Sequence, residues 1–169
     1  MGVCAIRIDE RLIHGQVATL WQGSWNCNRI MVIDTKSAND PMLKSVLKIA
    51  CPTGVRLSVL EPDTAAANLQ SGKYGKERIT IVTKTPGNLL RLIDQGYHLE
   101  SDITVGNMSG GSGKKKICKH ISVTPEDIEA FRKLDAMQYH LYQQTVPSET
   151  PAPFMKQLED ALAIGRAHV

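Results

Sequence analysis

The charged stretch at residues 7–17 has residue types and spacing that could hold or transfer an anion. It reads Arg-Ile-Asp-Glu-Arg-Leu-Ile-His-Gly-Gln-Val, with two arginines, two carboxylates and the histidine His14. Residues 3–6 before it form an apolar run of strand length, and apolar residues recur after it at helical spacing. We therefore expect a strand, a charged loop and a helix that begins at or just after His14. The unpaired amides and the dipole of a helix N-terminus favour an anion there.

Several side chains of this stretch could take part in anion chemistry. Imidazole attacks phosphorus readily near neutral pH, so His14 could carry a phosphoryl group. Arg11, three residues earlier, could offer that group a planar fork of donors, and Gly15 would let the backbone approach closely. Asp9 could hold either a ring nitrogen of His14 or the arginine. The alternative is a histidine that caps the helix or is partly buried and does no chemistry.

The rest of the chain supplies the elements that must position this loop. Apolar runs of strand length alternate with helical patterns, which indicates βαβ units on a largely parallel sheet. Further strands are expected at residues 29–33, 55–60, 79–82, 103–105 and 139–146, and helical patterns at 43–50, 62–70, 85–93, 124–134 and 154–162. We predict one α/β domain over residues 1–169, a doubly wound, mostly parallel sheet with helices on both faces. Val17, Leu20, Trp21 and Ser24 recur at helical spacing in the first helix, and in the helix at 43–50 one face is shared by Leu43, Val46, Leu47 and Ala50.

Ligands of an open α/β sheet gather at the carboxyl ends of its parallel strands. The stretch at residues 7–17 is the first loop of this kind. The others expected here are residues 34–37, 83–85 and 106–108. Which of them are neighbours depends on the order of the strands in the sheet.

The glycine-rich segment 106–116 matches neither common phosphate-binding loop. The spacing of Gly113 and Lys114 does not fit Gly-x-x-x-x-Gly-Lys-Ser/Thr, and Gly-x-Gly-x-x-Gly fails because Lys116 occupies the last position. The segment is then either a surface turn with a solvated basic patch or a loop that approaches the anion site or a partner. The three consecutive lysines leave nucleic-acid binding open as an alternative, although a net charge of +3 gives it little support. A non-covalent nucleotide- or anion-binding module is a second alternative.

The composition argues against several other classes of function. The chain has 169 residues, of which 42% are hydrophobic and 22% charged, as in ordinary globular domains. Its four cysteines include no Cys-x-x-Cys pair and its five histidines no pair four residues apart, so we expect mostly buried thiols, no metal site and no cofactor. No apolar run approaches about 20 residues, and the start lacks the order of a signal peptide. We expect a cytoplasmic protein without direct membrane insertion, and no nucleic-acid partner.

Residues 7–17, together with Trp21, resemble the N-terminal signature of a known family. This family is the IIB component of the mannose/fructose/sorbose group of the bacterial sugar phosphotransferase system. Weaker landmarks follow in the family's order, so the resemblance covers nearly the whole chain; they are residues 29–34, 84–86, 105–108, 122–128 and 144–147.

The resemblance implies a phosphocarrier enzyme. Its partners would be a phosphorylated IIA protein, the membrane components IIC and IID, and a sugar. His14 would be phosphorylated on Nδ1 (pros), Arg11 would neutralise the phosphate, and Asp9 would organise Arg11. Gly15, Gln16 and Arg7 would complete the phosphate- and substrate-binding set.

Two finer expectations also follow from the resemblance. Leu12 and Ile13 beside the histidine would offer an apolar contact surface to partners, with the alternative that Ile13 only anchors the loop. Residues 84–86 and 106–108 look more like the N-acetylgalactosamine branch than the mannose branch. The glycine-rich segment departs from the family, because residues 109–112 are Ser-Gly-Gly-Ser where an aromatic residue or histidine is common.

Overall fold

A seven-stranded sheet runs through the centre of the chain, with strand order β3-β2-β4-β1-β5-β8-β9. The computed structural model describes residues 2–167. All neighbouring strands are parallel except β8 and β9. The elements are β1 (Gly2–Asp9), α1 (Gly15–Trp25), β2 (Arg29–Ile33), α2 (Thr35–Ala38), α3 (Pro41–Ala50), β3 (Arg56–Leu60), α4 (Pro62–Gln70), β4 (Arg78–Thr83), α5 (Pro86–Asp94), β5 (Ile103–Asn107), β6 (Lys115–Cys118), β7 (Ile121–Val123), α6 (Pro125–Ala136), β8 (Leu141–Gln143), β9 (Ala152–Pro153) and α7 (Phe154–Ala167).

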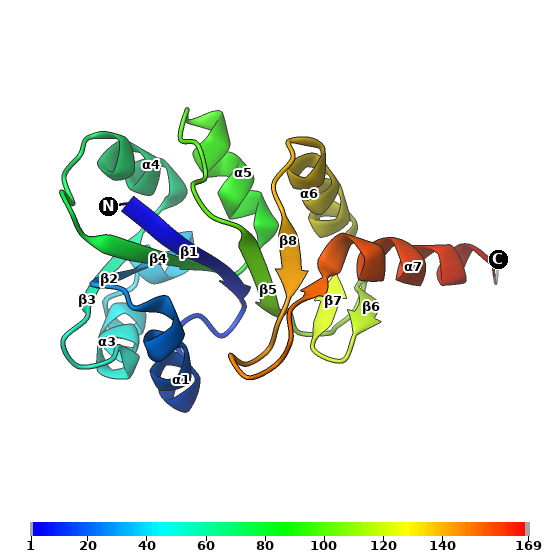
Figure 1. Cartoon of the computed structure of the whole chain (residues 1–169), viewed down its shortest axis with the longest axis horizontal. Helices are drawn as coiled ribbons and strands as arrows, with labels where there is room; N and C mark the ends of the chain where they lie inside the picture. Colours follow the sequence, from blue (N-terminus) through cyan, green and yellow to red (C-terminus); the bar gives the residue numbers. More distant parts are fainter. Residues whose placement is uncertain (1, 168–169) are drawn as a thin grey trace.

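Helices cover both faces of this sheet, as predicted. In Figure 1, α1 and α3 lie on one side of it and α4, α5 and α6 on the other. The first side is closed by a small apolar cluster that includes Ala18, Ile30 and Leu47. The second side is closed by a larger cluster that includes Leu89 and Phe131. The predicted doubly wound, mostly parallel α/β architecture is therefore confirmed.

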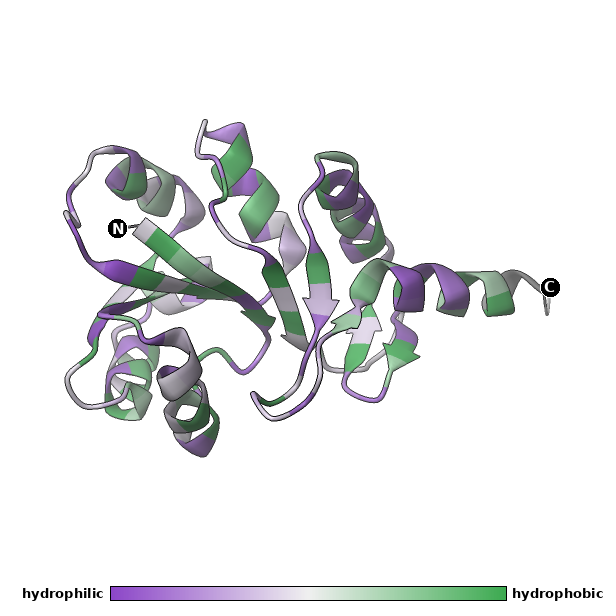
Figure 2. Ribbon diagram, in the orientation of Figure 1, coloured by the Kyte–Doolittle hydropathy of each residue, from purple (hydrophilic) through white to green (hydrophobic). Residues whose placement is uncertain are grey.

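The central strands are apolar because both of their faces are covered. Figure 2 shows hydrophobic residues concentrated in the strands, while the helices carry a hydrophobic and a hydrophilic side. Ile6, Ile30 and Ile81, from three adjacent strands, are each at most 1% exposed. Continuous apolar runs of this kind are typical of parallel strands buried on both faces. The site-bearing strand β1 is thus held rigidly in the middle of the molecule.

The hairpin formed by β6 and β7 was not expected from the sequence. These strands pair antiparallel, with Lys116 opposite Ser122, and form a separate two-stranded sheet. The lysine run is therefore partly a strand instead of a solvated turn. Ile121 and Val123 are buried in the larger apolar cluster. Packing of these two side chains explains why a segment with weak local signals becomes ordered.

Some helix and strand details differ from the prediction. Leu20 is 57% exposed and Val46 is 56% exposed, so neither faces inward. In α1 the buried residues are Ala18 and Trp21, because the contacts of Trp21 fix the rotation of the helix. The strand expected at 139–146 is only Leu141–Gln143.

The cysteine side chains are free thiols that differ in exposure. Of the four free cysteines, Cys27 is buried, Cys51 and Cys118 are intermediate, and Cys4 is exposed, so the thiols are less buried than expected. None of the helices in residues 2–167 is both long and apolar enough to cross a bilayer.

Candidate functional site

The strand order places the loop after β1 at a switch point of the sheet. β1 lies between β4 and β5, and its chain continues into α1 on one face. The chains leaving β4 and β5 lead to α5 and α6 on the opposite face. A crevice at the carboxyl ends of the strands forms where neighbouring connections diverge in this way. The loops after β4, β1 and β5 are consequently neighbours.

His14 occupies the N-cap position of α1, and its side chain is exposed. Its backbone is extended (φ −129°, ψ 108°), and its imidazole makes no capping hydrogen bond. The Ala18 N–H donates to the His14 carbonyl at 3.1 Å, so the amides of Gly15, Gln16 and Val17 precede the first intrahelical hydrogen bond. A Cβ built on Gly15 would meet nothing within 4 Å. The geometry leaves open space beside the histidine, and the amides of this first turn have no acceptor among residues 2–167.

Both oxygens of the Asp9 carboxylate accept hydrogen bonds from Arg11. Arg11 Nε donates to Oδ1 at 2.9 Å, Nη2 donates to Oδ2 at 2.8 Å, and the Arg11 backbone N–H donates to Oδ1 at 3.0 Å. These bonds raise the pKa of the Arg11 guanidinium, against the effect of its partial burial. Of the two roles left open for Asp9, the structure therefore shows that of orienting the arginine.

Arg11 keeps part of its guanidinium available to a ligand. Its side chain is 32% exposed, whereas that of Asp9 is 2% exposed. The Nη1 group of Arg11 has no acceptor in the part of the chain that the structure describes. A guanidinium fixed at one edge and open at the other is pre-oriented for an anion.

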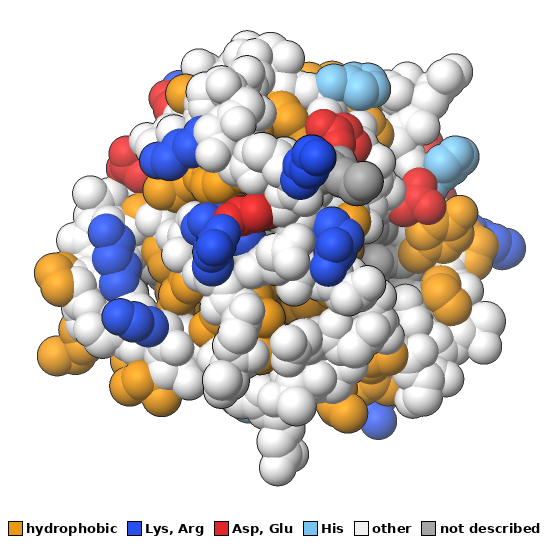
Figure 3. All heavy atoms as spheres, turned by 60° about the vertical axis from the view of Figure 1, so that its left-hand side comes forward, with side chains coloured by type: hydrophobic (Ala, Val, Ile, Leu, Met, Phe, Trp, Pro, Cys, Tyr) orange, Lys and Arg blue, Asp and Glu red, His pale blue; other side chains and the backbone are white. Residues whose placement is uncertain are grey.

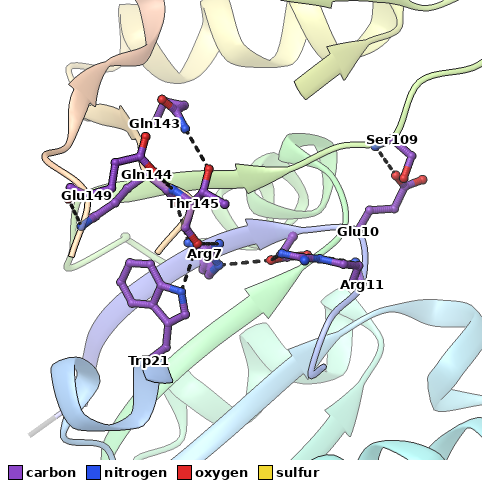
Figure 4. A network of polar contacts seen from close by, with 10 residues as sticks. Arg7, Glu10, Arg11, Trp21, Ser109, Gln143, Gln144, Thr145 and Glu149 are labelled. Atoms are coloured by element: carbon purple, nitrogen blue, oxygen red, sulfur yellow. Dashed lines mark hydrogen bonds and ion pairs between the residues drawn. The ribbon is translucent and has the colours of Figure 1, made fainter. Parts of the chain in front are cut away.

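Arg7 faces the interior, which contradicts the expectation that it binds phosphate. Its side chain is 2% exposed, and Nη1 and Nη2 donate to the carbonyls of Gln144 and Thr145 at 2.9 Å and 3.0 Å. Nε donates to Asp9 at 3.3 Å, and the guanidinium lies 4.5 Å from the Trp21 ring centre. Burial lowers the pKa of Arg7 more than Asp9 raises it. Figure 4 shows this network joining β1 to the loop after β8.

Trp21 and Gly106 both lie against Arg7, a contact that the sequence did not predict, although it placed Gly106 in a candidate ligand loop and Trp21 in the family signature. The Trp21 indole N–H donates to the Thr145 carbonyl at 3.4 Å. A Cβ on Gly106 would overlap the Arg7 guanidinium, so only glycine leaves room for it. The sequence does show a glycine directly after the predicted strand 103–105. No local pattern, however, indicated that Arg7 is the neighbour of Gly106 in space.

Glu10 joins the loop after β1 to the glycine-rich segment. Its carboxylate accepts a short hydrogen bond from the Ser109 N–H and lies 3.8 Å from Lys114 Nζ, which also donates to the Ser109 carbonyl. Burial acts to raise the pKa of Glu10, but the Ser109 hydrogen bonds and the charges of Lys114 and Lys84 outweigh it and lower the pKa. Figure 4 shows Glu10 and Ser109 facing each other. The segment therefore approaches the site through Ser109 and Lys114, while Lys115 and Lys116 remain exposed, as the alternative of a solvated basic patch expects.

Leu12 and Ile13 are buried, which contradicts their expected role as exposed contacts for partners. Leu12 is 9% exposed and Ile13 is 6% exposed, and both belong to the small apolar cluster beneath α1 and α3. Leu12 has a positive φ of 60°, a conformation that costs a non-glycine residue energy. Its N–H donates to the Asp9 carbonyl at 2.9 Å, which closes the turn. Both side chains thus anchor the loop.

The loops after β2 and β4 add charge near the site. Lys84, directly after β4, has its Nζ 4.0 Å from Asp34 Oδ2 after β2. Asp34 caps α2 by accepting the Ser37 N–H at 3.1 Å. Lys84 also contributes to the lowered pKa of Glu10. Positive charge therefore approaches the His14 loop from a second strand.

The fold and the site together define a doubly wound α/β protein that presents an exposed histidine at the start of its first helix, on the same loop as an oriented arginine. The chain belongs to the phosphotransferase-system IIB components of the sorbose subfamily. The model of this family, described as "PTS system sorbose subfamily IIB component", matches residues 3–165. It is accordingly a phosphotransferase component of bacterial sugar uptake.

Curated relatives named for different sugars resemble the chain to a similar degree. The sorbose-specific EIIB component of Klebsiella pneumoniae is 31% identical over 95% of this chain and 97% of its own length. The N-acetylgalactosamine-specific IIB component 2 of Escherichia coli K12 is 33% identical over 90% and 96%. The mannose-specific EIIAB component of the same strain is 35% identical over 92% of this chain, which spans 48% of that protein.

Solved structures show the same architecture. The IIB domain of the sorbose permease from Klebsiella pneumoniae has a TM-score of 0.90 and 31% identity, and the match covers 95% of this chain and 98% of that one. The N-acetylgalactosamine-specific IIB component 1 of Escherichia coli has a TM-score of 0.82 and 27% identity, covering 89% and 98%.

Proposed function

We propose that His14 accepts a phosphoryl group from a phosphohistidine of a IIA protein and passes it to a sugar. The observation that carries this proposal is the exposed imidazole of His14 at the start of α1, with no hydrogen bond to any residue in 2–167 and with Arg11 oriented on the same loop. A phosphate there would meet unpaired helix amides and a guanidinium. Gln16, exposed in the first turn of α1, is included in the proposed phosphate-binding set.

Both steps are simple displacements at phosphorus. In the first, Nδ1 of His14 attacks the phosphorus of the donor, the new P–N bond forms, and the donor's P–N bond breaks as its imidazole regains a neutral or protonated form. In the second, the oxygen of a sugar hydroxyl attacks the phosphorus and forms a P–O bond while the His14 P–N bond breaks, and the released imidazole takes up the proton that the hydroxyl loses. Positioning and charge neutralisation supply most of the catalysis of such transfers.

The proposed partners are a IIA protein, the membrane components IIC and IID, and a sugar bound by those membrane components. Residues 1–169 would act as one IIB unit at the cytoplasmic face of the membrane, held there by the transporter and not by a span of their own. Relatives named for sorbose, mannose and N-acetylgalactosamine share 31–35% identity with the chain, which supports a sugar choice made largely by the membrane components. The N-acetylgalactosamine branch stays a prediction from residues 84–86 and 106–108.

Phosphorylation by labelled phospho-IIA tests the role of His14. The protein should acquire one acid-labile, base-stable phosphate, and His14→Ala should abolish the label. His140→Ala is the matched control, since His140 is exposed and follows the far end of α6. Label that survives His14→Ala, or is lost only in His140→Ala, would refute the assignment. A non-covalent nucleotide- or anion-binding module would show no label in either case.

A further inference from the structure

A groove on the molecule lies between α3 and the edge strand β3, apart from His14. Its volume is about 720 Å³, and it is lined by apolar residues of β3 together with basic side chains. In Figure 3, which brings the α3 and β3 side of the molecule forward, Lys and Arg side chains spread over this face with hydrophobic side chains between them. None of the residues assigned to the phosphoryl site lines this groove.

The floor of the groove is apolar and runs beside an open sheet edge. β3 is the last strand of the sheet, and its neighbour within residues 2–167 is β2 alone. Val55, Leu57 and Val59 line the groove and are only partly buried against the apolar cluster beneath α3. A strand added to this edge would find free backbone groups on β3 and apolar contacts for alternate side chains.

The rim of the groove is cationic and incompletely neutralised. Arg29 and Arg56 both bind Glu77, Arg29 through Nε at 2.6 Å. Lys44 and Lys48 lie one helical turn apart on α3 and are exposed. Neither lysine has a carboxylate partner in the part of the chain that the structure describes. The groove therefore favours a ligand that brings negative charge.

We propose that this groove binds an extended segment of a partner protein that is apolar at its centre and acidic at its flanks. The segment adds as a strand to β3, its apolar side chains pack on Leu57 and Val59, and its carboxylates meet Lys44 and Lys48. A second copy of the chain fits poorly, since pairing of two β3 edges would bring two sets of these lysines together. The proposal is independent of phosphoryl transfer and gives the IIB unit a second attachment point.

Fluorescence anisotropy with a synthetic probe tests the proposal. The probe is a labelled peptide of about ten residues with a Val-Ile core flanked by glutamates, and a peptide of equal charge with serines in the core is its control. The apolar probe should bind to the full chain, and the Lys44→Glu/Lys48→Glu variant should bind it about tenfold more weakly. The control variant Lys73→Glu/Lys119→Glu, with the same change of charge at exposed lysines outside the groove, should bind like the original chain.

A second measurement reports the mode of binding. Amide NMR shifts on addition of the probe should centre on β3 and α3, and the β3 amides should become protected from hydrogen exchange. Equal binding of the serine peptide, equal weakening in both lysine variants, shifts centred elsewhere, or self-association of the chain through β3 would each overturn the proposal. So would an absence of binding at about 1 mM peptide. Phosphorylation of His14 would be unaffected by any of these results.

Discussion

Arg11 and Arg7 are four residues apart and have opposite surroundings. Arg11 is held by Asp9 at the surface with one nitrogen group open, whereas Arg7 is enclosed by backbone carbonyls and an indole ring. Both bind the same carboxylate, which is itself buried. The Asp9 carboxylate therefore orients two arginines. Arg7 is buried and has a structural role, whereas Arg11 faces solvent.

Replacement of Arg11 should affect phosphoryl transfer far more than folding. Arg11→Ala removes a pre-oriented positive charge from the phosphate, and we expect the transfer rate to fall by about 100-fold or more. Asp9 keeps its bond to Arg7, so the change in unfolding free energy should stay near 1 kcal/mol. Rapid-quench kinetics with phospho-IIA and urea unfolding measure the two effects. An unchanged transfer rate would show that Arg11 does not neutralise the phosphate.

Substitution of Gly106 should destabilise the protein through Arg7. In Gly106→Ala the new Cβ would displace the buried guanidinium, and we expect a loss of about 2–4 kcal/mol in unfolding free energy. Gly111→Ala is the matched control, because a Cβ there meets nothing within 4 Å, and its change should stay within about 0.5 kcal/mol. Urea unfolding compares them, and similar values for both variants would contradict this account of Gly106.

At the scale of elements, the helix starts are stabilised in different ways. Thr124 forms a capping box at α6, in which its side chain accepts the Asp127 N–H and the Asp127 carboxylate accepts the Thr124 N–H. Thr85 at α5 makes no side-chain capping bond, and neither does His14 at α1. The uncapped start of α1 leaves its amides to a ligand, which is what an anion site requires.

The two threonine caps allow a paired test of this difference. Thr124→Ala should lower the unfolding free energy by about 1 kcal/mol, since a donor at the start of α6 loses its acceptor. Thr85→Ala should cost clearly less, because no such bond exists there. Thermal or urea unfolding decides between them, and equal losses would mean that the cap geometry of α6 contributes nothing. Phosphorylation of His14 should be unchanged in Thr124→Ala.

At the scale of the whole molecule, the two ends of the sheet have different roles. The carboxyl ends of β4, β1 and β5 carry the proposed phosphoryl site, whereas Glu77 connects the amino ends of β2, β3 and β4. Glu77 binds Arg29 and Arg56, and the hydrogen bonds from Arg29 lower the pKa of its carboxyl more than burial raises it. The network stabilises the sheet without involving the phosphoryl site.

The lowered pKa of Glu77 predicts how stability should vary with pH. A group whose folded pKa is depressed adds stability above its unfolded pKa, near 4.5, and this contribution is lost as pH falls through the folded pKa. The original chain should exceed Glu77→Gln in unfolding free energy by about 1 kcal/mol at neutral pH. The difference should shrink below about pH 4.5. Urea unfolding from pH 7 to pH 3.5 measures it, and a difference that is constant or grows in acid would contradict the assignment.

Much of the fold could be predicted from the sequence because its signals are local. Most strand and helix periods and the position of His14 before α1 are encoded within a few neighbouring residues, and they were confirmed. The charged stretch at residues 7–17 likewise showed which residue types meet at the first loop. The exceptions, the β6–β7 hairpin and the outward rotation of Leu20, depend on packing against distant elements.

Only the tertiary structure decided how the residues of the site divide their roles. Arg7 contacts Gln144, 137 residues away, and Glu10 contacts Ser109, 99 residues away. Both contacts depend on the strand order that places β5 next to β1 and β8 next to β5, and no local pattern records that order. The sequence by itself therefore determined the family, the architecture and the position of His14 before the first helix. The three-dimensional arrangement determined which arginine is buried, which is open to an anion, and where a groove lies at the β3 edge of the sheet.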